Sequence, residues 1–144
     1  MLNFVDTNVL VYAHDSSDQL RHQPAAALVD ELWRARSGVL STQVLTEFYA
    51  VITRKLVTPM SRRKARVLVD AYGAWPVVQV DSTLIVSASA LEEQHSFSFW
   101  DALIIEAARR AGAYRLLSED LQHGRRIDGI VIENPFAPTP PPAR

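Results

Sequence analysis

Short apolar runs alternate with helical patterns along most of this 144-residue chain. The runs that read as strands are residues 2–5, 39–40, 77–80, 114–117 and 129–132. Between them, apolar residues recur three and four positions apart, which is the spacing of one helix face. Strands that alternate with helices favour parallel βαβ units, whose sheet is covered by helices on both faces. The sequence therefore predicts an α/β fold with three α/β/α layers and a mostly parallel sheet of about five strands.

The predicted helices begin at residues that cap helices well and end near glycine or proline. We expect helices to start after Asp6, at Pro24, after Ser41 or Thr42, after Ser61, after Asp81 or Ser82, and near Ser98. Gly38, Gly73 and Gly112 are expected near helix ends, and Pro59 closes another helix.

The length and composition indicate one globular domain, because 48% of the residues are hydrophobic and the chain is too short for two ordinary cores. We place this domain at residues 1–134 and a proline-rich C-terminal tail at 135–144. The apolar runs are short and interrupted by charge, so neither a signal peptide nor a membrane span is expected. With no cysteine and no membrane segment, we expect a cytoplasmic protein.

Four acidic residues fall where a parallel sheet collects its ligands, outside the carboxyl ends of the strands. Asp6 ends the first predicted strand, and Asp120 closely follows the strand at 114–117. Asp101 lies in the first turn of its predicted helix, while Glu47 lies about one turn into the helix after residue 40.

Each acid also has an ordinary structural explanation. Asp6 can cap a helix, and Asp101 stands three residues after Ser98 in a capping-box pattern. Glu47 can be an exposed helical residue, and Asp120 can make a side-chain turn before Gly124. As a group they are harder to explain, because four carboxylates at one edge repel one another unless a cation compensates.

Oxygen ligands of this kind suit Mg²⁺ or Mn²⁺, which bind a few carboxylates and keep several waters. Such ions activate water and stabilise the leaving oxygen in phosphodiester hydrolysis. The four histidines, by contrast, show neither the helical pairing of zinc sites nor a partnered nucleophile, and only His123 is expected near the acids. A glycine-rich phosphate loop is also missing from the sequence.

The formal net charge is only −1, but basic residues are concentrated between residues 34 and 66, where Glu47 is the only acid. Taken alone, such a stretch is more often the solvated surface of a helix. Beside a nuclease centre the same residues would hold the phosphate backbone of RNA. The candidates for this role are Arg54, Lys55, Arg62 and Arg63.

Four segments that contain the acids, residues 4–8, 42–47, 99–104 and 117–124, together with 134–136, resemble PIN-domain ribonucleases of the VapC toxin type. They follow the order of the family and span nearly the whole domain. The resemblance implies an endoribonuclease that depends on Mg²⁺ or Mn²⁺, in which Asp6, Glu47, Asp101 and Asp120 form the acidic quartet.

The same resemblance implies supporting roles for Thr7, Asn8 and Ser118, which would orient carboxylates or water by hydrogen bonds. Asp120 matches the fourth acid better than its neighbour Glu119, because it stands two residues after Ser118. The resemblance further implies a cognate antitoxin protein and a homodimer.

Two other functions compete with this hypothesis. A non-catalytic nucleic-acid-binding or regulatory protein could keep the fold and the basic surface, and its binding would persist without metal and depend steeply on salt. A phosphatase or receiver domain could use Asp6 as its nucleophile, although it would leave Glu47 and Asp101 unexplained.

Overall fold

A six-stranded sheet forms the centre of the molecule in the computed structural model, which describes residues 1–138. The strands are β1 (Asn3–Val5), β2 (Gly38–Ser41), β3 (Val77–Val78), β4 (Arg115–Leu117), β5 (Arg126–Ile127) and β6 (Ile130–Glu133). They lie in the order β3-β2-β1-β4-β6-β5, and every neighbouring pair is parallel except β5 with β6. The predicted, mostly parallel sheet is confirmed. Strand β5 was not predicted, because it has only two residues and one of them, Arg126, is exposed.

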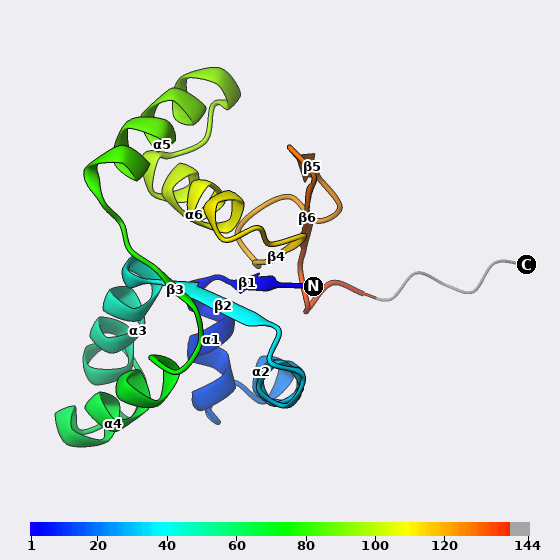
Figure 1. The fold of residues 1–144 in the computed structure, drawn as a ribbon. Coiled ribbons are helices and arrows are strands. Elements are labelled where there is room, and N and C mark those ends of the chain that lie inside the picture. Colours follow the sequence, from blue (N-terminus) through cyan, green and yellow to red (C-terminus); the bar gives the residue numbers. More distant parts are fainter. Residues whose placement is uncertain (139–144) are drawn as a thin grey trace, which may run out of the picture.

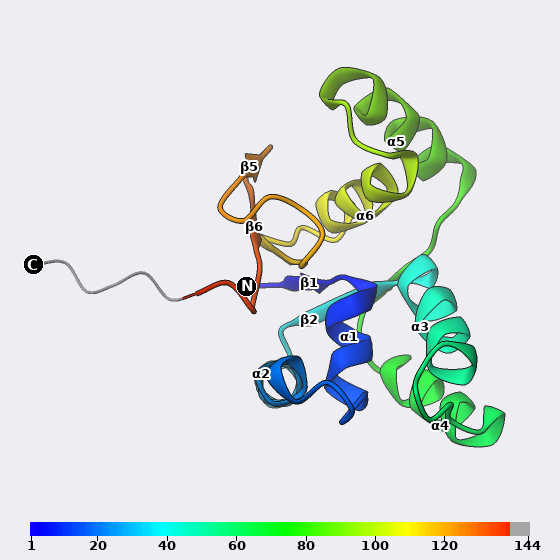
Figure 2. The ribbon, with the colours of Figure 1, turned by 180° about the vertical axis from the view of Figure 1, so that it is seen from behind.

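Six helices cover the two faces of this sheet within the described residues. They are α1 (Thr7–His14), α2 (Gln19–Ala35), α3 (Thr42–Arg54), α4 (Arg62–Tyr72), α5 (Ser82–His95) and α6 (Phe99–Arg110). The pair α5 and α6 lies on one face, and α1 to α4 lie on the other (Figures 1 and 2). The three-layer α/β/α architecture is therefore as predicted.

The second helix differs from its prediction at both ends. It begins at Gln19, because the Asp18 side chain accepts a hydrogen bond from the Arg21 backbone N–H at 3.2 Å and caps it. Pro24 therefore lies inside the helix, where it cannot donate to the carbonyl of Leu20; that residue is exposed, so water can replace the donor. At the other end Arg36 adopts a left-handed conformation with φ 53°, a role expected for Gly38.

Gly38 instead begins β2 and is needed there for packing. A Cβ atom at this position would lie 2.3 Å from the Trp75 ring, so no side chain fits between the strand and the indole. The core on both sides of the sheet is apolar and buried, with Phe4, Leu40 and Leu116 from the strands and Phe48 and Ile105 from the helices.

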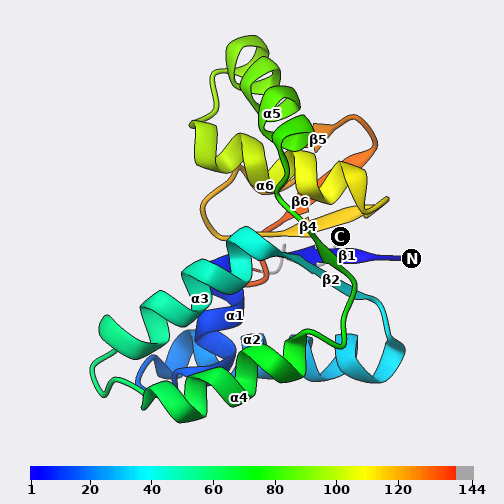
Figure 3. The ribbon, with the colours of Figure 1, turned by 60° about the vertical axis from the view of Figure 1, so that its left-hand side comes forward.

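The strands deliver polar residues to one edge of the sheet. In Figure 3, β1 runs away from the N-terminus and leads into α1 at the edge where α3 begins. The first residue after β1 is Asp6, and Ser118 follows β4 directly. Because these parallel strands end together, side chains from distant parts of the sequence meet at this edge.

The boundary between the domain and its tail at residue 134 remains a prediction. Within the described residues, the Phe136 ring packs edge-on against Tyr12, with ring centroids 5.4 Å apart. Most of the predicted tail, residues 139–144, lies outside the described residues. No helix within residues 1–138 is both long enough and apolar enough to cross a membrane.

Candidate active site

The four predicted acids line one small pocket at the carboxyl edge of the sheet. Its volume is about 100 Å³, and they reach it from four places: the end of β1, helix α3, the start of α6 and the loop after β4. The residues that line it are Asp6, Thr7, Asn8, Gln43, Glu47, Trp100, Asp101, Ile104 and Asp120. The supporting residues Thr7 and Asn8 are thus in the pocket, while Ser118 lies behind it.

Asp6 is the most buried of the four acids, with 7% of its surface exposed. One carboxylate oxygen accepts a hydrogen bond from the Thr7 backbone N–H at 2.7 Å, and the other accepts one from the Ser118 hydroxyl at 2.8 Å. Burial raises the pKa of Asp6 from 3.8 to about 6, because the loss of water outweighs these two hydrogen bonds. The nearby charges of Asp120 and Glu47 raise the pKa in the same direction.

Glu47 is fixed by one side chain from its own helix and one from α1. The Thr7 hydroxyl donates to one carboxylate oxygen at 2.7 Å, and the Gln43 amide donates to the other at 3.0 Å. Gln43 and Glu47 are four residues apart in α3, so they share one side of the helix. Thr7 therefore connects the end of β1 to α3 across the pocket.

Asp120 receives a hydrogen bond from the Asn8 side-chain amide at 2.8 Å, and its own backbone N–H donates to the Ser118 hydroxyl at 3.2 Å. Partial burial and the charges of Glu119 and Asp101 raise its pKa above the ordinary value. Glu119 faces elsewhere, because its carboxylate accepts a hydrogen bond from the Arg21 guanidinium at 2.8 Å. Of these two adjacent acids, only Asp120 lines the pocket.

Asp101 occupies the capping-box position predicted from the sequence. Its backbone N–H donates to the Ser98 hydroxyl at 3.1 Å, so Ser98 caps α6. Among residues 1–138 no hydrogen bond reaches the Asp101 carboxylate, which lines the pocket together with the other three. Capping thus accounts for the backbone of Asp101 but leaves its carboxylate available.

The described residues leave the negative charge of this pocket unbalanced. None of the ion pairs formed within residues 1–138 includes Asp6, Glu47, Asp101 or Asp120. In the described part of the chain, the buried side-chain oxygen of Gln43 also has no hydrogen-bond partner. A cation that carries bound water would supply both the missing positive charge and a donor for this oxygen.

In the described part of the chain, no three His, Cys, Asp or Glu side chains already stand close enough to chelate an ion. This geometry still fits Mg²⁺ or Mn²⁺, because Mg²⁺ is held by one or two carboxylates and retains several waters. The oxygen-only donors around the pocket match the preference of both ions.

The predicted substrate-binding residues do not line the pocket. Arg54 ends α3, Lys55 follows it, and Arg62 and Arg63 begin α4. None of the four joins an ion pair within residues 1–138. Arg54 stands two helical turns after Glu47, so it lies on the same side of α3, about 10 Å further along the axis.

Three residues of the site were not assigned from the sequence: Gln43, Trp100 and Ile104. The four-residue spacing between Gln43 and Glu47 was the available signal for the first. His123 does not line the pocket; its ring accepts a hydrogen bond from the Asn134 backbone N–H at 2.9 Å.

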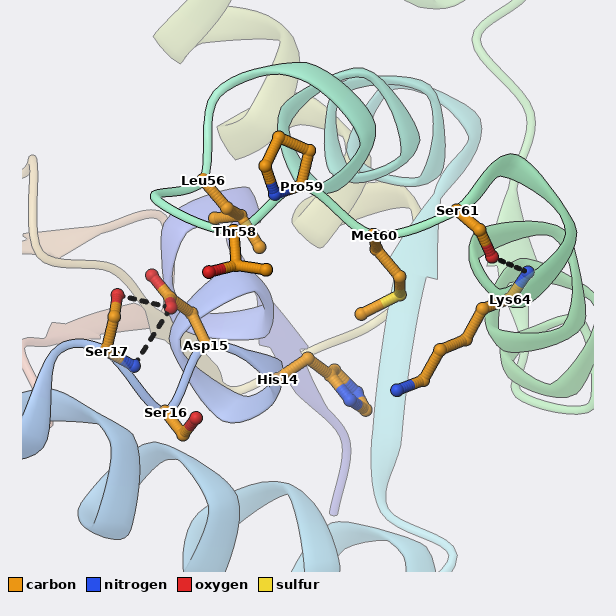
Figure 4. A pocket seen from close by; sticks show the side chains of 10 residues that line it. All are labelled: His14, Asp15, Ser16, Ser17, Leu56, Thr58, Pro59, Met60, Ser61 and Lys64. Atoms are coloured by element: carbon orange, nitrogen blue, oxygen red, sulfur yellow. Dashed lines mark hydrogen bonds between the residues drawn. The ribbon is translucent and has the colours of Figure 1, made fainter.

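A larger hollow of about 400 Å³ lies at the other end of α1, between the α1–α2 and α3–α4 loops (Figure 4). Its one carboxylate, Asp15, accepts hydrogen bonds from Ser17. The His14 ring is hydrogen-bonded to the Tyr72 hydroxyl at 2.6 Å, and burial lowers the pKa of His14, with His22 and Lys64 adding to the effect. With Asp15 as its single carboxylate, this hollow is a weaker candidate for metal-dependent chemistry.

Solved structures with the same fold include a toxin and a toxin–antitoxin complex. VapC20 of Mycobacterium tuberculosis, a Sarcin-Ricin loop cleaving toxin, is 23% identical, with a TM-score of 0.63 over 82% of this chain and 91% of that chain. A toxin–antitoxin complex from Klebsiella pneumoniae is 14% identical, with a TM-score of 0.68 over 92% of this chain and 97% of that chain. VapBC2 of Rickettsia felis, bound to a DNA fragment from its promoter, is 17% identical, with a TM-score of 0.65 over 93% and 98%.

At these identities the solved structures establish the fold. Comparison with curated protein sequences gives no significant match. The PIN domain family model, however, matches residues 4–128, a range that contains all four acids of the pocket. The chain therefore belongs to the PIN domain family.

Proposed function

We propose that this protein is a metal-dependent endoribonuclease that hydrolyses RNA phosphodiester bonds and serves as the toxin of a toxin–antitoxin pair. The observation that carries the proposal is one pocket lined by four carboxylates, none of which joins an ion pair within residues 1–138. Membership of the PIN domain family and the same fold in VapC20, a Sarcin-Ricin loop cleaving toxin, support this reading.

Asp6, Glu47, Asp101 and Asp120 would hold Mg²⁺ or Mn²⁺. When bound there, the ion lowers the pKa of a water molecule and stabilises negative charge on the reacting phosphate and the leaving oxygen. Hard, hydrated ions of this type are the ones that oxygen donors select.

The other polar residues of the site orient the carboxylates by hydrogen bonds. Thr7 and Gln43 hold the two oxygens of Glu47, and Asn8 holds Asp120. Ser118 donates to Asp6 and accepts from the backbone of Asp120, so it keeps these two acids in register. Such hydrogen bonds fix ligand orientation and commonly change metal affinity or activity about 10- to 100-fold.

Substrate RNA would run from the pocket along α3 toward its basic end. Arg54 lies on the same side of this helix as Glu47, and Lys55, Arg62 and Arg63 follow at the α3–α4 junction. These cations would hold phosphates without reading sequence.

The proposed partners follow from the relatives. The structures from Klebsiella pneumoniae and Rickettsia felis are complexes of toxin–antitoxin systems, so we propose a cognate antitoxin for this chain as well. A homodimer and a cytoplasmic location complete the proposal.

The decisive test is cleavage of RNA by purified protein in Mg²⁺ or Mn²⁺, with matched reactions in EDTA. Asp6→Asn removes one proposed ligand. Glu133→Gln removes an acid on β6 that does not line the pocket, and serves as the control. We expect cleavage by the wild type and by Glu133→Gln, and none in EDTA or by Asp6→Asn. Cleavage that survives both EDTA and Asp6→Asn would refute the proposal.

A further inference from the structure

Trp100 is a large apolar side chain exposed beside the carboxylates. It is the second residue of α6, lines the acid pocket and has 64% of its surface exposed. An indole in this position gains little from burial in the folded chain. Its exposure next to charged groups therefore calls for an explanation other than packing of the core.

The other two tryptophans lie in a separate aromatic cluster. The Trp33 and Trp75 rings pack edge to face with centroids 5.2 Å apart, and both contact Tyr72. Trp75 is buried, as core packing requires. Trp100 takes no part in this cluster.

The position of Trp100 is nevertheless fixed. Its backbone carbonyl accepts a hydrogen bond from the Gln43 amide at 3.4 Å, and its ring packs against Phe99 with centroids 5.5 Å apart. Ser98 caps the same helix turn through Asp101. The backbone of Trp100 is thus held beside the pocket by the residues that also contact Glu47 and Asp101, while Phe99 packs against the indole.

We propose that Trp100 is a stacking platform for an unpaired nucleobase next to the scissile phosphate. The inference rests on the proposed ribonuclease function and names its substrate class: RNA that is single-stranded at the cleavage point. Trp100 and Asp101 line the same pocket, so a base on Trp100 would bring an adjacent phosphate toward the carboxylates. Aromatic side chains on which bases stack, combined with basic residues that hold the backbone, are the usual way in which proteins hold single strands without reading sequence.

The test compares two probes of equal length, single-stranded RNA of random sequence and a ribose–phosphate chain without bases. Binding is measured by fluorescence anisotropy in EDTA, so that cleavage does not interfere. Both probes carry the same charge, and only the first can stack.

We expect the wild type to prefer the RNA that carries bases, and Trp100→Ala to weaken binding of that probe roughly 5- to 150-fold while leaving the abasic chain unaffected. Trp100→Phe, which keeps an aromatic face, should retain most of the preference. Val86→Ala, which trims another exposed apolar side chain on α5, is the matched control and should bind as the wild type does. Circular dichroism of each variant verifies that it is folded.

Equal losses with both probes, or an unchanged affinity of Trp100→Ala for RNA, would overturn the inference. An unchanged RNA affinity with self-association that requires Trp100 would assign this surface to protein contact instead. Cleavage assays in Mg²⁺ separate the two proposals. If the wild type cleaves RNA and Trp100→Ala cleaves it with the same KM, the stacking role is refuted and the ribonuclease function stands. If the wild type does not cleave RNA, the proposed ribonuclease function is refuted.

Discussion

Charged side chains at the two ends of strand β4 differ in whether they are paired with an opposite charge. At its start, the Arg115 guanidinium donates to the Asn3 side-chain oxygen at 2.7 Å and forms an ion pair with Glu133. The Asn3 amide in turn donates to the backbone carbonyl of Ser37 at 3.2 Å. Beyond its other end, Ser118 leads to Asp120 and to Asp6, whose carboxylates accept hydrogen bonds only from neutral donors within residues 1–138.

A charged group paired with an opposite charge stabilises the fold, whereas a group of unpaired carboxylates is suited to bind a cation. A partly buried charge is stabilising when the protein itself provides an opposite charge and hydrogen bonds, as it does for Arg115. Neighbouring carboxylates repel one another and destabilise the folded state when no cation is bound. Such arrangements are concentrated at functional sites. The largest effects on function and on stability should therefore appear at opposite ends of β4.

The strongest contrast should come from the two adjacent acids after β4. We expect Asp120→Asn to reduce RNA cleavage by more than about 100-fold, because it removes a proposed metal ligand. Glu119→Gln should change the rate only a few-fold, because Glu119 binds Arg21 outside the pocket. Rates measured side by side in Mg²⁺ decide between them. Equal losses in both variants, or a larger loss in Glu119→Gln, would contradict the assignment of Asp120.

Ionisation of the buried Asp6 carboxyl should lower the free energy of unfolding, so the stability of the protein should depend on pH. Its pKa is raised to about 6 in the folded chain, so the folded state binds the proton more tightly than the unfolded state. The free energy of unfolding should therefore fall as the pH rises from about 4 to about 6, and stay lower above that range. Asp6→Asn removes the charge, so it should be more stable than the wild type at pH 7.5 by up to about 3 kcal/mol.

Urea denaturation in EDTA at several pH values measures this difference. The advantage of Asp6→Asn should shrink as the pH falls from about 6 toward 4 and vanish well below 3.8, where the wild-type carboxyl is protonated in both states. Arg115→Met is the comparison at the other end of β4 and should lose about 1–3 kcal/mol, because it leaves Asn3 and Glu133 without their partner. An Asp6→Asn variant that is less stable than the wild type at pH 7.5 would contradict the account.

The smallest effect should come from the basic end of α3, which holds RNA without doing chemistry. Removing the charge of Arg54 or Lys55 should weaken RNA binding a few-fold at moderate salt, and lower the slope of log affinity against log salt by about 1 for each charge. Arg34→Ala provides the control, since that guanidinium is already paired with Asp30 at 3.1 Å. A salt slope unchanged in the Arg54 and Lys55 variants would place the RNA elsewhere.

The sequence predicted the parts of this molecule that depend on local pattern. The helix starts after Ser61 and Ser98 are examples, because capping needs only a hydroxyl three residues before the N–H that it accepts from. The start of α2 was missed, because Pro24 suggested a first turn while Asp18 provided the cap. Strand β5 was missed since a two-residue strand leaves no period to detect.

The four acids that line the pocket were also predicted from local sequence pattern. Each acid was placed at the edge by its distance from a predicted strand or helix start, which depends on the chain alone. The outward turn of Glu119 depends on Arg21, which is far away in sequence. The exposure of Trp100 depends on how α6 lies against the sheet, and no local pattern encodes that orientation.

Calorimetric titration of Mn²⁺ into the RNA-free protein tests the central claim most directly. If the carboxylate pocket is completed by a divalent cation, the wild type and Glu133→Gln should bind the ion, and Asp6→Asn and Asp120→Asn should bind it at least about 10-fold more weakly. Near pH 6, binding should also release roughly half a proton from Asp6, seen as a dependence of the heat on the buffer, and at pH 8 this release should disappear. Equal Mn²⁺ affinity in all four proteins, or no binding by the wild type, would contradict the account.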